Sequence, residues 1–465
     1  MVIKQQTGPC SVSVYQNASS ELRFLGLPFC LLARPNLLQC YTLSWYSHHQ
    51  GWDMNRASRV GIFSVSVLIF CFAGIGHVLL GRGADDKAYK SLTVYGEVLQ
   101  KIQQDYVDDP NMRTVTAGAL HGLLESLDPQ SSYLTPREYE EYKKKIGNPG
   151  TGDAGLTLSK RYGYIIVLSV LPDSPGTKAG IRSGDLLESI GGFTTRDMSV
   201  GQALNLLNGQ PGTGIKVSVI RRGKATPEEV DIVREKLTTP KLIVQKADPD
   251  ILVLRFPSLD AGRAEEVRNR LVDAEKQGIH KVILDFRQCG RGPVSEAISL
   301  ARFFIPTGTL TTLRGQSVSA QVISAEPKQV IWKNPVSVLV DTTTSGAAEV
   351  LAAAMEANHR GDVVGERTFG LASEQKLITL DDGAALILTV ANYYNANGKP
   401  ILEEGVTPTE IVRADAQDDS DSGDDAAPAP EARKEPGQGP RPLSPEDPIF
   451  HRALDLLKTP AKKAA

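Results

Sequence analysis

The segment "VLVDTTTSGAAEVLAAAMEA", residues 338–357, joins a short apolar run to an alanine-rich helix through a turn of small residues. A buried strand followed by such a turn brings the turn to the end of a sheet, beside the free N–H groups that begin the helix. Turns of this kind often present a nucleophile. Ser345 is the serine of this turn, but no lysine lies between Lys333 and Lys376 to act as its base.

The residues before this segment alternate between strand and helix patterns. Apolar strand runs occupy residues 251–259 and 281–287, and amphipathic helix patterns occupy residues 264–278 and 295–304. Strands that alternate with helices predict a layered sheet with functional residues at the strand ends. We therefore expect an α/β core over residues 240–413, with the quoted turn at one strand end.

A second unit precedes the core, at residues 153–236. Three strand-like runs, separated by turns rich in glycine and proline, surround one helical pattern at residues 199–207. The unit resembles a PDZ domain, and "SPGTKAGIRSGDLLESIGG" (174–192) carries most of that resemblance. The resemblance implies a peptide that adds a strand to the sheet edge while backbone N–H groups bind its terminal carboxylate. The implied carboxylate loop is Ala154, Gly155, Leu156 and Thr157.

Two further regions flank these units. Residues 85–147 carry apolar residues at helical spacing and predict a small helical cap. Residues 414–448 are acidic and rich in proline, so they cannot bury enough apolar surface to fold and are expected to be disordered. A short helix is predicted at residues 449–458.

The N-terminal part carries an uncharged apolar run at residues 60–80, about the length needed to cross a bilayer as a helix. Arg56 and Arg59 precede the run, so a single-pass anchor would leave the bulk of the chain extracytoplasmic, either periplasmic or extracellular. A cleaved signal peptide is the alternative. Residues 1–53 form an extension without clear periodicity.

The composition argues against several kinds of partner. The net charge of −3 gives no reason to expect nucleic acid as a partner. The five cysteines, at positions 10, 30, 40, 71 and 289, lack metal-ligand spacing. We therefore expect no metal site and no cofactor.

The order of helical cap, PDZ-like unit and α/β core resembles the carboxyl-terminal processing peptidases, also called tail-specific proteases. The resemblance runs from Tyr89 to Val412. It implies a multidomain α/β fold with a β-rich PDZ-like domain, a ClpP/crotonase-like peptidase core and serine-type endopeptidase activity. The motifs that carry it are "LDPQSSYL" (127–134), "VILDFRQCGRG" (282–292), "VVGERTFGLASEQ" (363–375) and "NANGKPILEEGVTP" (395–408).

The enzymes of that family use a serine nucleophile and a lysine base, which must be held neutral to accept the hydroxyl proton. When the motifs are anchored on Glu349, the resemblance places the serine position at Gly346 and the lysine position at Leu371. Neither residue supplies the required group. Gln375, which accompanies the lysine, is retained, and Ala347 and Gly292 are the implied donors of the oxyanion hole.

A shifted catalytic centre would have to use Ser345, with Lys376, His359 or Cys289 in unforeseen roles. Neighbouring residues on a strand or turn point their side chains in different directions, so Ser345 is expected to face away from the site. The leading interpretation is therefore a catalytically impaired, membrane-anchored homologue. Its PDZ domain would bind unfolded or C-terminal protein tails, and its core cleft would hold a peptide or a partner peptidase. The alternatives are an active serine endopeptidase with a rearranged nucleophile and a scaffold that binds no peptide.

Overall fold

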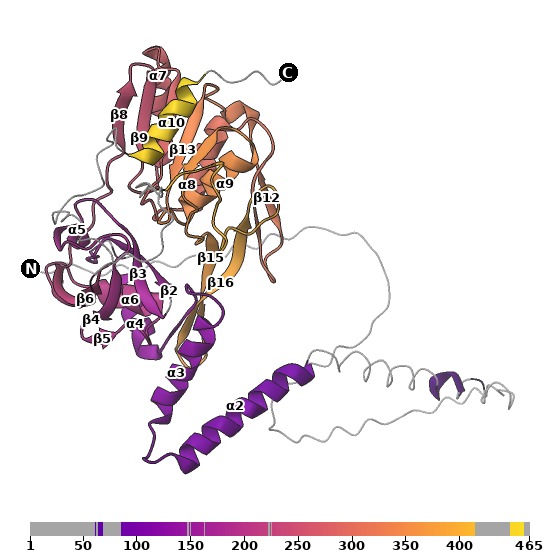
Figure 1. The fold of residues 1–465 in the computed structure, drawn as a ribbon. Coiled ribbons are helices and arrows are strands. Elements are labelled where there is room, and N and C mark those ends of the chain that lie inside the picture. The colour runs from indigo at the N-terminus through magenta and orange to yellow at the C-terminus, as the bar shows by residue number, and fades with distance from the viewer. Residues whose placement is uncertain are drawn as a thin grey trace, which may run out of the picture. The chain divides into compact units, whose positions relative to one another are not determined.

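The computed structural model describes residues 61, 64–67, 85–146, 148, 150–161, 163–221, 224, 226–413 and 447–459 (Figure 1). The extension at residues 1–53, most of the apolar run at 60–80 and all but the last two residues of 414–448 lie outside this part. Within the described ranges, no helix combines the length and the apolar character that a membrane span requires.

The region after the apolar run forms three helices and a short strand. Asn111 caps the second helix by accepting hydrogen bonds from the backbone of Arg113 and Thr114. Thr135 and Glu138 form a reciprocal capping box at the start of the third. The elements are α2 (Asp85–Asp105), α3 (Met112–Glu125), β1 (Ser132–Leu134) and α4 (Pro136–Lys145).

The PDZ-like unit is an antiparallel sheet with strand order β2-β3-β4-β6-β7 and its own apolar core. β2 is an edge strand, because it pairs only with β3, and α6 packs beside it. The elements are β2 (Leu156–Arg161), β3 (Tyr164–Val170), α5 (Pro175–Lys178), β4 (Leu186–Ile190), β5 (Phe193–Thr194), α6 (Val200–Leu207), β6 (Gly214–Ile220) and β7 (Glu228–Val233).

The core is built on a six-stranded sheet with order β17-β14-β13-β10-β9-β8, in which only β8 is antiparallel to its neighbour. Its central strands are buried on both faces, as expected for a parallel sheet covered by helices. The strands are β8 (Ile243–Asp248), β9 (Ile251–Arg255), β10 (Lys281–Asp285), β13 (Val336–Val340), β14 (Asp362–Gly365) and β17 (Glu410–Ile411).

Helices cover the two faces of this sheet. Leu252 and Leu254 of β9 pack with α7 (Arg263–Lys276), α8 (Val294–Phe304) and α9 (Ala347–Ala357). Ile251 and Val253, which alternate with them, pack with the C-terminal helix α10 (Pro448–Lys458), and Figure 1 shows α10 beside β9 and β13. The predicted multidomain α/β fold is confirmed in this architecture.

A second sheet, with order β1-β16-β11-β12 and β15 paired to β16, connects the core to the cap. β16 pairs with β1 at Ser132–Leu134 and with β11 farther along its length. The 3-10 turn η1 (Pro327–Gln329) follows β12. The strands are β11 (Thr309–Arg314), β12 (Gln321–Ser324), β15 (Ser373–Thr379) and β16 (Ala385–Tyr394).

Candidate functional site

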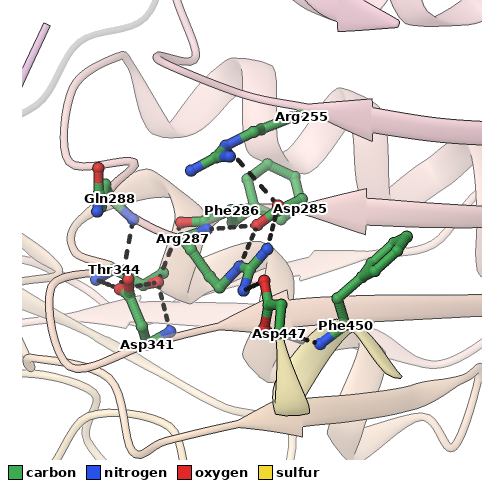
Figure 2. A network of polar contacts seen from close by, with 9 residues as sticks. All are labelled: Arg255, Asp285, Phe286, Arg287, Gln288, Asp341, Thr344, Asp447 and Phe450. Carbon is green, nitrogen blue, oxygen red and sulfur yellow. Dashed lines mark hydrogen bonds and ion pairs between the residues drawn. The ribbon is translucent and has the colours of Figure 1, made fainter. Parts of the chain in front are cut away.

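The turn after β13 is shaped by Asp341. Its Oδ1 atom accepts hydrogen bonds from the backbone N–H groups of Thr343 (3.0 Å) and Thr344 (2.8 Å). The same oxygen accepts from Gln288 N (3.3 Å), and Thr344 Oγ1 donates to Phe286 O (3.0 Å), as Figure 2 shows. Because Phe286 and Gln288 follow β10, these contacts bind the ends of two parallel strands into one platform.

Gly346 ends this turn and is the N-cap residue of α9. Its backbone has φ 64° and ψ −121°, a conformation that residues with a Cβ rarely adopt. A Cβ built at this position would meet no atom within 4 Å. The position therefore offers room for a reactive side chain, but the residue present is the one that occupies this conformation without strain.

Glu349 contacts both positions that the motif resemblance predicts for the serine and the lysine, Gly346 and Leu371. Its buried carboxylate accepts, at Oε2, hydrogen bonds from Gly346 N (2.8 Å) and Leu371 N (2.7 Å). At Oε1 it accepts from Thr368 Oγ1 (2.5 Å) and Gly370 N (2.6 Å). Burial raises the pKa of Glu349, and the hydrogen bonds that it accepts oppose this rise. The structure thus brings the backbones of residues 346 and 371 to a single oxygen atom.

Leu371 lies two residues before β15, and Gln375 lies within the strand. Leu371 is half-buried and has an apolar side chain where a proton acceptor would be needed. Gln375 is exposed, and its Nε2 atom donates to Gln130 O (3.1 Å) in the turn before β1. The retained glutamine therefore contacts the cap.

Ser345 is fully buried, and its hydroxyl has no hydrogen-bond partner among the described residues. The Oγ atom lies 2.6 Å from the point that a Cβ of Gly290 would occupy, so it faces the loop after β10. Its backbone N–H donates to Cys289 O (3.1 Å) in the same loop. The adjacent position, Gly346, has open space at its Cβ, so the two neighbours differ in orientation as expected for a sharp turn.

The other residues considered for a shifted centre lie in different surroundings. Lys376 is exposed on β15, and His359 follows the C-terminal end of α9 with φ 50°. Cys289 is 1% exposed, and burial raises the pKa of its thiol. The Ser345 hydroxyl forms no hydrogen bond to any of these three within the described part of the chain.

The implied oxyanion donors lie on both sides of the turn. Ala347 is the first residue of α9 and is buried. Gly292 has φ 127°, and a Cβ there would lie 2.1 Å from Leu259 O, so this glycine packs against the segment after β9. Gly290, by contrast, contacts Ser345 directly.

The predicted carboxylate-binding loop of the PDZ-like unit is buried, and some of its backbone groups already form hydrogen bonds within the unit. Gly155 N donates to Asp153 Oδ1 (2.7 Å), and Gly155 O accepts from Leu171 N (2.9 Å). Ala154 O accepts from Gly176 N (2.8 Å), while Leu156 and Thr157 pair with β3. Asp153 also pairs with Arg291 of the core loop at 3.0 Å, so the two loops are linked through this carboxylate.

Sequence reasoning missed a buried ionic network at the start of α10. Arg287, which follows β10, contacts Asp285 at 2.8 Å and Asp447 at 2.5 Å (Figure 2). Asp447 also accepts from Phe450 N (3.1 Å) and thereby caps α10. The available signal was an aspartate that ends an otherwise apolar strand beside an arginine, because buried charges must be paired.

Comparison with known proteins agrees with these two units. Residues 250–412 match peptidase family S41, and residues 166–221 match the PDZ domain. A carboxy-terminal-processing protease of Bartonella bacilliformis is 26% identical over 333 residues, which cover 70% of this chain and 76% of that protein. The carboxy-terminal processing protease CtpA of Bacillus subtilis is 28% identical over 342 residues, covering 73% and 72% of the two chains.

A solved structure supports the fold. The photosystem II D1 C-terminal processing protease superposes with a TM-score of 0.58 at 23% identity, covering 69% of this chain and 92% of that one. At this identity the likeness concerns the fold alone. The resemblance to carboxyl-terminal processing peptidases predicted from the motifs is confirmed by these matches.

Proposed function

Because this chain carries a PDZ domain followed by a peptidase family S41 core, we propose that it is a catalytically impaired homologue of the carboxy-terminal processing proteases that binds protein tails. The pair Gly346 and Leu371 carries the proposal. The backbone N–H groups of both residues donate to the same carboxylate oxygen of Glu349, so the scaffold that would position two catalytic groups is retained. Serine-type hydrolysis requires a nucleophile and a base within hydrogen-bond reach, and neither side chain provides one.

A rearranged nucleophile is the rival function, and the surroundings of Ser345 argue against it. A hydroxyl becomes a useful nucleophile only when a neighbouring base accepts its proton. The Ser345 hydroxyl is buried against Gly290 and hydrogen-bonds to no described residue. An attacking oxygen in this place would lack both an activating partner and access to a peptide bond.

Tail binding is assigned to the PDZ-like unit. β2 is an edge strand, because it pairs only with β3, and an extended peptide can pair with the edge of a sheet. A terminal carboxylate would compete with Asp153 for the N–H group of Gly155. The side chain of Asp153 would then be released toward Arg291, with which it already pairs.

The remaining parts of the proposal concern location and partners. The uncharged run at residues 60–80 favours a single membrane anchor, with the PDZ domain and the core extracytoplasmic. A homologue that binds tails without cutting them would present them to a partner peptidase or protect them from one. Membrane fractionation with alkaline extraction tests the anchor, because a variant lacking residues 1–83 should move to the soluble fraction.

The decisive experiment incubates the purified chain from Asp85 onward with a disordered protein substrate. We expect no cleavage and no labelling by serine-directed reagents, in the wild type and in Ser345→Ala alike. Cleavage by the wild type that disappears in Ser345→Ala would establish an active enzyme and overturn the proposal.

Binding is tested separately with fluorescent tail peptides. Peptides with a free C-terminal carboxylate should bind, and amidation should weaken them about tenfold or more, because amidation removes the charge that the backbone N–H groups face. If neither form binds, the chain is a scaffold without peptide affinity.

A further inference from the structure

A cavity of about 740 Å³ lies at the edge of the second sheet, within the size range of ligand pockets. Its lining contains none of the positions discussed above as catalytic or carboxylate-binding. β15 pairs with residues 385–392 of β16 along one edge of that strand. β1 pairs with residues 385–387 and β11 with residues 392–394, so these two strands lie on the opposite edge of β16, which is the edge at the cavity. The lining residues come from 127–128, 314–316, 389–394 and 400–404.

The floor of this cavity is an interrupted strand edge. β1 pairs with residues 385–387 of β16 and β11 with residues 392–394, so residues 388–391 have no strand partner on this edge, although the N–H group of Thr389 donates to Ser131 Oγ (3.2 Å). Val390 is an extra residue in the pairing with β15, which makes a β-bulge. A Cβ at Gly315 would lie 1.9 Å from Val390 O, so glycine permits the close approach of the two backbones at the rim.

Charged side chains of both signs line the cavity. The Arg314 guanidinium carbon lies 3.8 Å from the centre of the Tyr394 ring, an arrangement that holds the cation flat against the wall. Glu403 and Glu404 also line the cavity. None of these three side chains forms an ion pair within the described ranges, although they share one cavity.

The backbone at Glu403 adds a second unusual feature. Its φ is 66°, one of few positive values at residues other than glycine, and such strain is often retained at functional sites. The N–H group of Glu403 donates to Gly370 O (2.9 Å), the residue before Leu371. The wall that carries the carboxylates is therefore fixed to the loop bound by Glu349.

We propose that this cavity binds an extended peptide segment that carries one acidic and one basic side chain. The acidic side chain would pair with Arg314, whose flat guanidinium suits bidentate contact with a carboxylate. The basic side chain would face Glu403 and Glu404, and the peptide backbone would contact the part of the β16 edge that lies between β1 and β11. The site needs no free carboxyl terminus, so it goes beyond the tail capture assigned to the PDZ-like unit.

The test uses fluorescent peptides that are acetylated and amidated, in a Gly/Ser background, with one Asp and one Lys two or four positions apart. We expect the wild type to bind the mixed-charge peptide at least about tenfold more tightly than versions with Asn for Asp or Gln for Lys. Arg314→Glu should lose about tenfold in affinity. Lys399→Glu, an equal charge change outside the cavity lining, is the matched control and should change affinity less than about twofold.

Thermal melting of each variant shows whether it folds, and exposed Arg314 is not expected to affect folding. The proposal is overturned if no blocked peptide binds the wild type, or if Arg314→Glu and Lys399→Glu behave alike. Because the peptides lack a free carboxylate, their failure to bind leaves tail capture intact. Likewise, a protein that fails to bind C-terminal tails but binds the blocked mixed-charge peptide would still support the proposal for this cavity.

Discussion

At the residue scale, a single buried carboxylate connects the turn after β13 to the loop before β15. Glu349 accepts four hydrogen bonds from the turn at Gly346 and from the loop at residues 368–371. These contacts depend on backbone N–H groups and one threonine, not on the side chains of residues 346 and 371.

The conformation of Gly346 makes a prediction about stability. Gly346→Ala should destabilise the protein by about 1–2 kcal/mol, because a Cβ is strained at φ 64° even where space is free. Gly118→Ala is the matched control. Gly118 lies in α3 with open space around it, and the same change should stabilise by about 0.5–1 kcal/mol. Denaturant unfolding measures both, and changes of equal sign would contradict the strain argument.

The role of Glu349 makes a second prediction. Glu349→Gln should cost about 2–4 kcal/mol, because the amide NH₂ group would face donors that now bind a carboxylate oxygen. Glu356→Gln, on the same helix and without such bonds, should change the free energy of unfolding by less than about 0.5 kcal/mol. A similar loss in the two variants would show that the network does not hold the turn.

At the scale of elements, α10 completes the core from a distant point in the chain. Ile449, Phe450, Ala453 and Leu457 cover the sheet face formed by Ile251, Val253, Ile283, Leu339 and Val364. Without the helix, this apolar face would meet water. The ionic contacts of Arg287 fasten the N-terminal end of α10 beside the loop that leads to Gln288 and the Asp341 platform.

Loss of the contact between Arg287 and Asp447 should lower the free energy of unfolding. Asp447→Ala deletes the cap of α10 and the partner of Arg287, which is only 11% exposed, so we expect a loss of about 2–4 kcal/mol in unfolding free energy. Asp455→Ala, on the exposed side of the same helix, should change it by less than about 0.5 kcal/mol. If both variants unfold like the wild type in urea, the ionic contact does not stabilise α10.

At the scale of the whole molecule, polar contacts join the cap to the PDZ-like unit. Gln202 Nε2, at the start of α6, lies 3.2 Å from His121 Nε2 and donates to Glu138 Oε1 at 2.7 Å. Gln202 Oε1 accepts from Ser199 N, which fixes the amide with its NH₂ group toward His121. His121 must therefore be neutral at Nε2 to accept this contact.

The contact predicts a pH dependence of stability. Burial lowers the pKa of His121 below its ordinary value of 6.5, with Lys160 lowering it further and Glu138 and Glu125 opposing the shift. At pH values between the lowered pKa of His121 in the folded protein and its ordinary value, the unfolded chain binds more protons at this residue than the folded chain does. The contribution of His121 to the free energy of unfolding should therefore decrease as the pH falls through this range, and it should be fully present above about pH 6.5. His121→Gln should remove this component, as measured by urea unfolding between pH 5 and 7.5. An unchanged pH profile in the variant would contradict it.

The fold could be predicted from the sequence because its signals are local. Strand and helix periodicity gave the α/β core, and the turn residues around 174–192 gave the PDZ-like unit. The assignment of Gly346 and Leu371 to the two catalytic positions also came from motif spacing and stays a prediction. Local patterns do not say which side chains meet across the fold.

The sequence by itself determined the order of the domains and the absence of a serine and a lysine at the two positions, because residue identity and short-range periodicity are written along the chain. Only the tertiary structure decided that one oxygen of Glu349 holds both positions, that the Ser345 hydroxyl is buried against Gly290, and that Asp447 returns to Arg287. Apart from the local bond between Gly346 and Glu349, these contacts join residues from 22 to 160 positions apart, or depend on the direction in which a turn points a side chain. Long-range packing sets such contacts, and no local pattern encodes it.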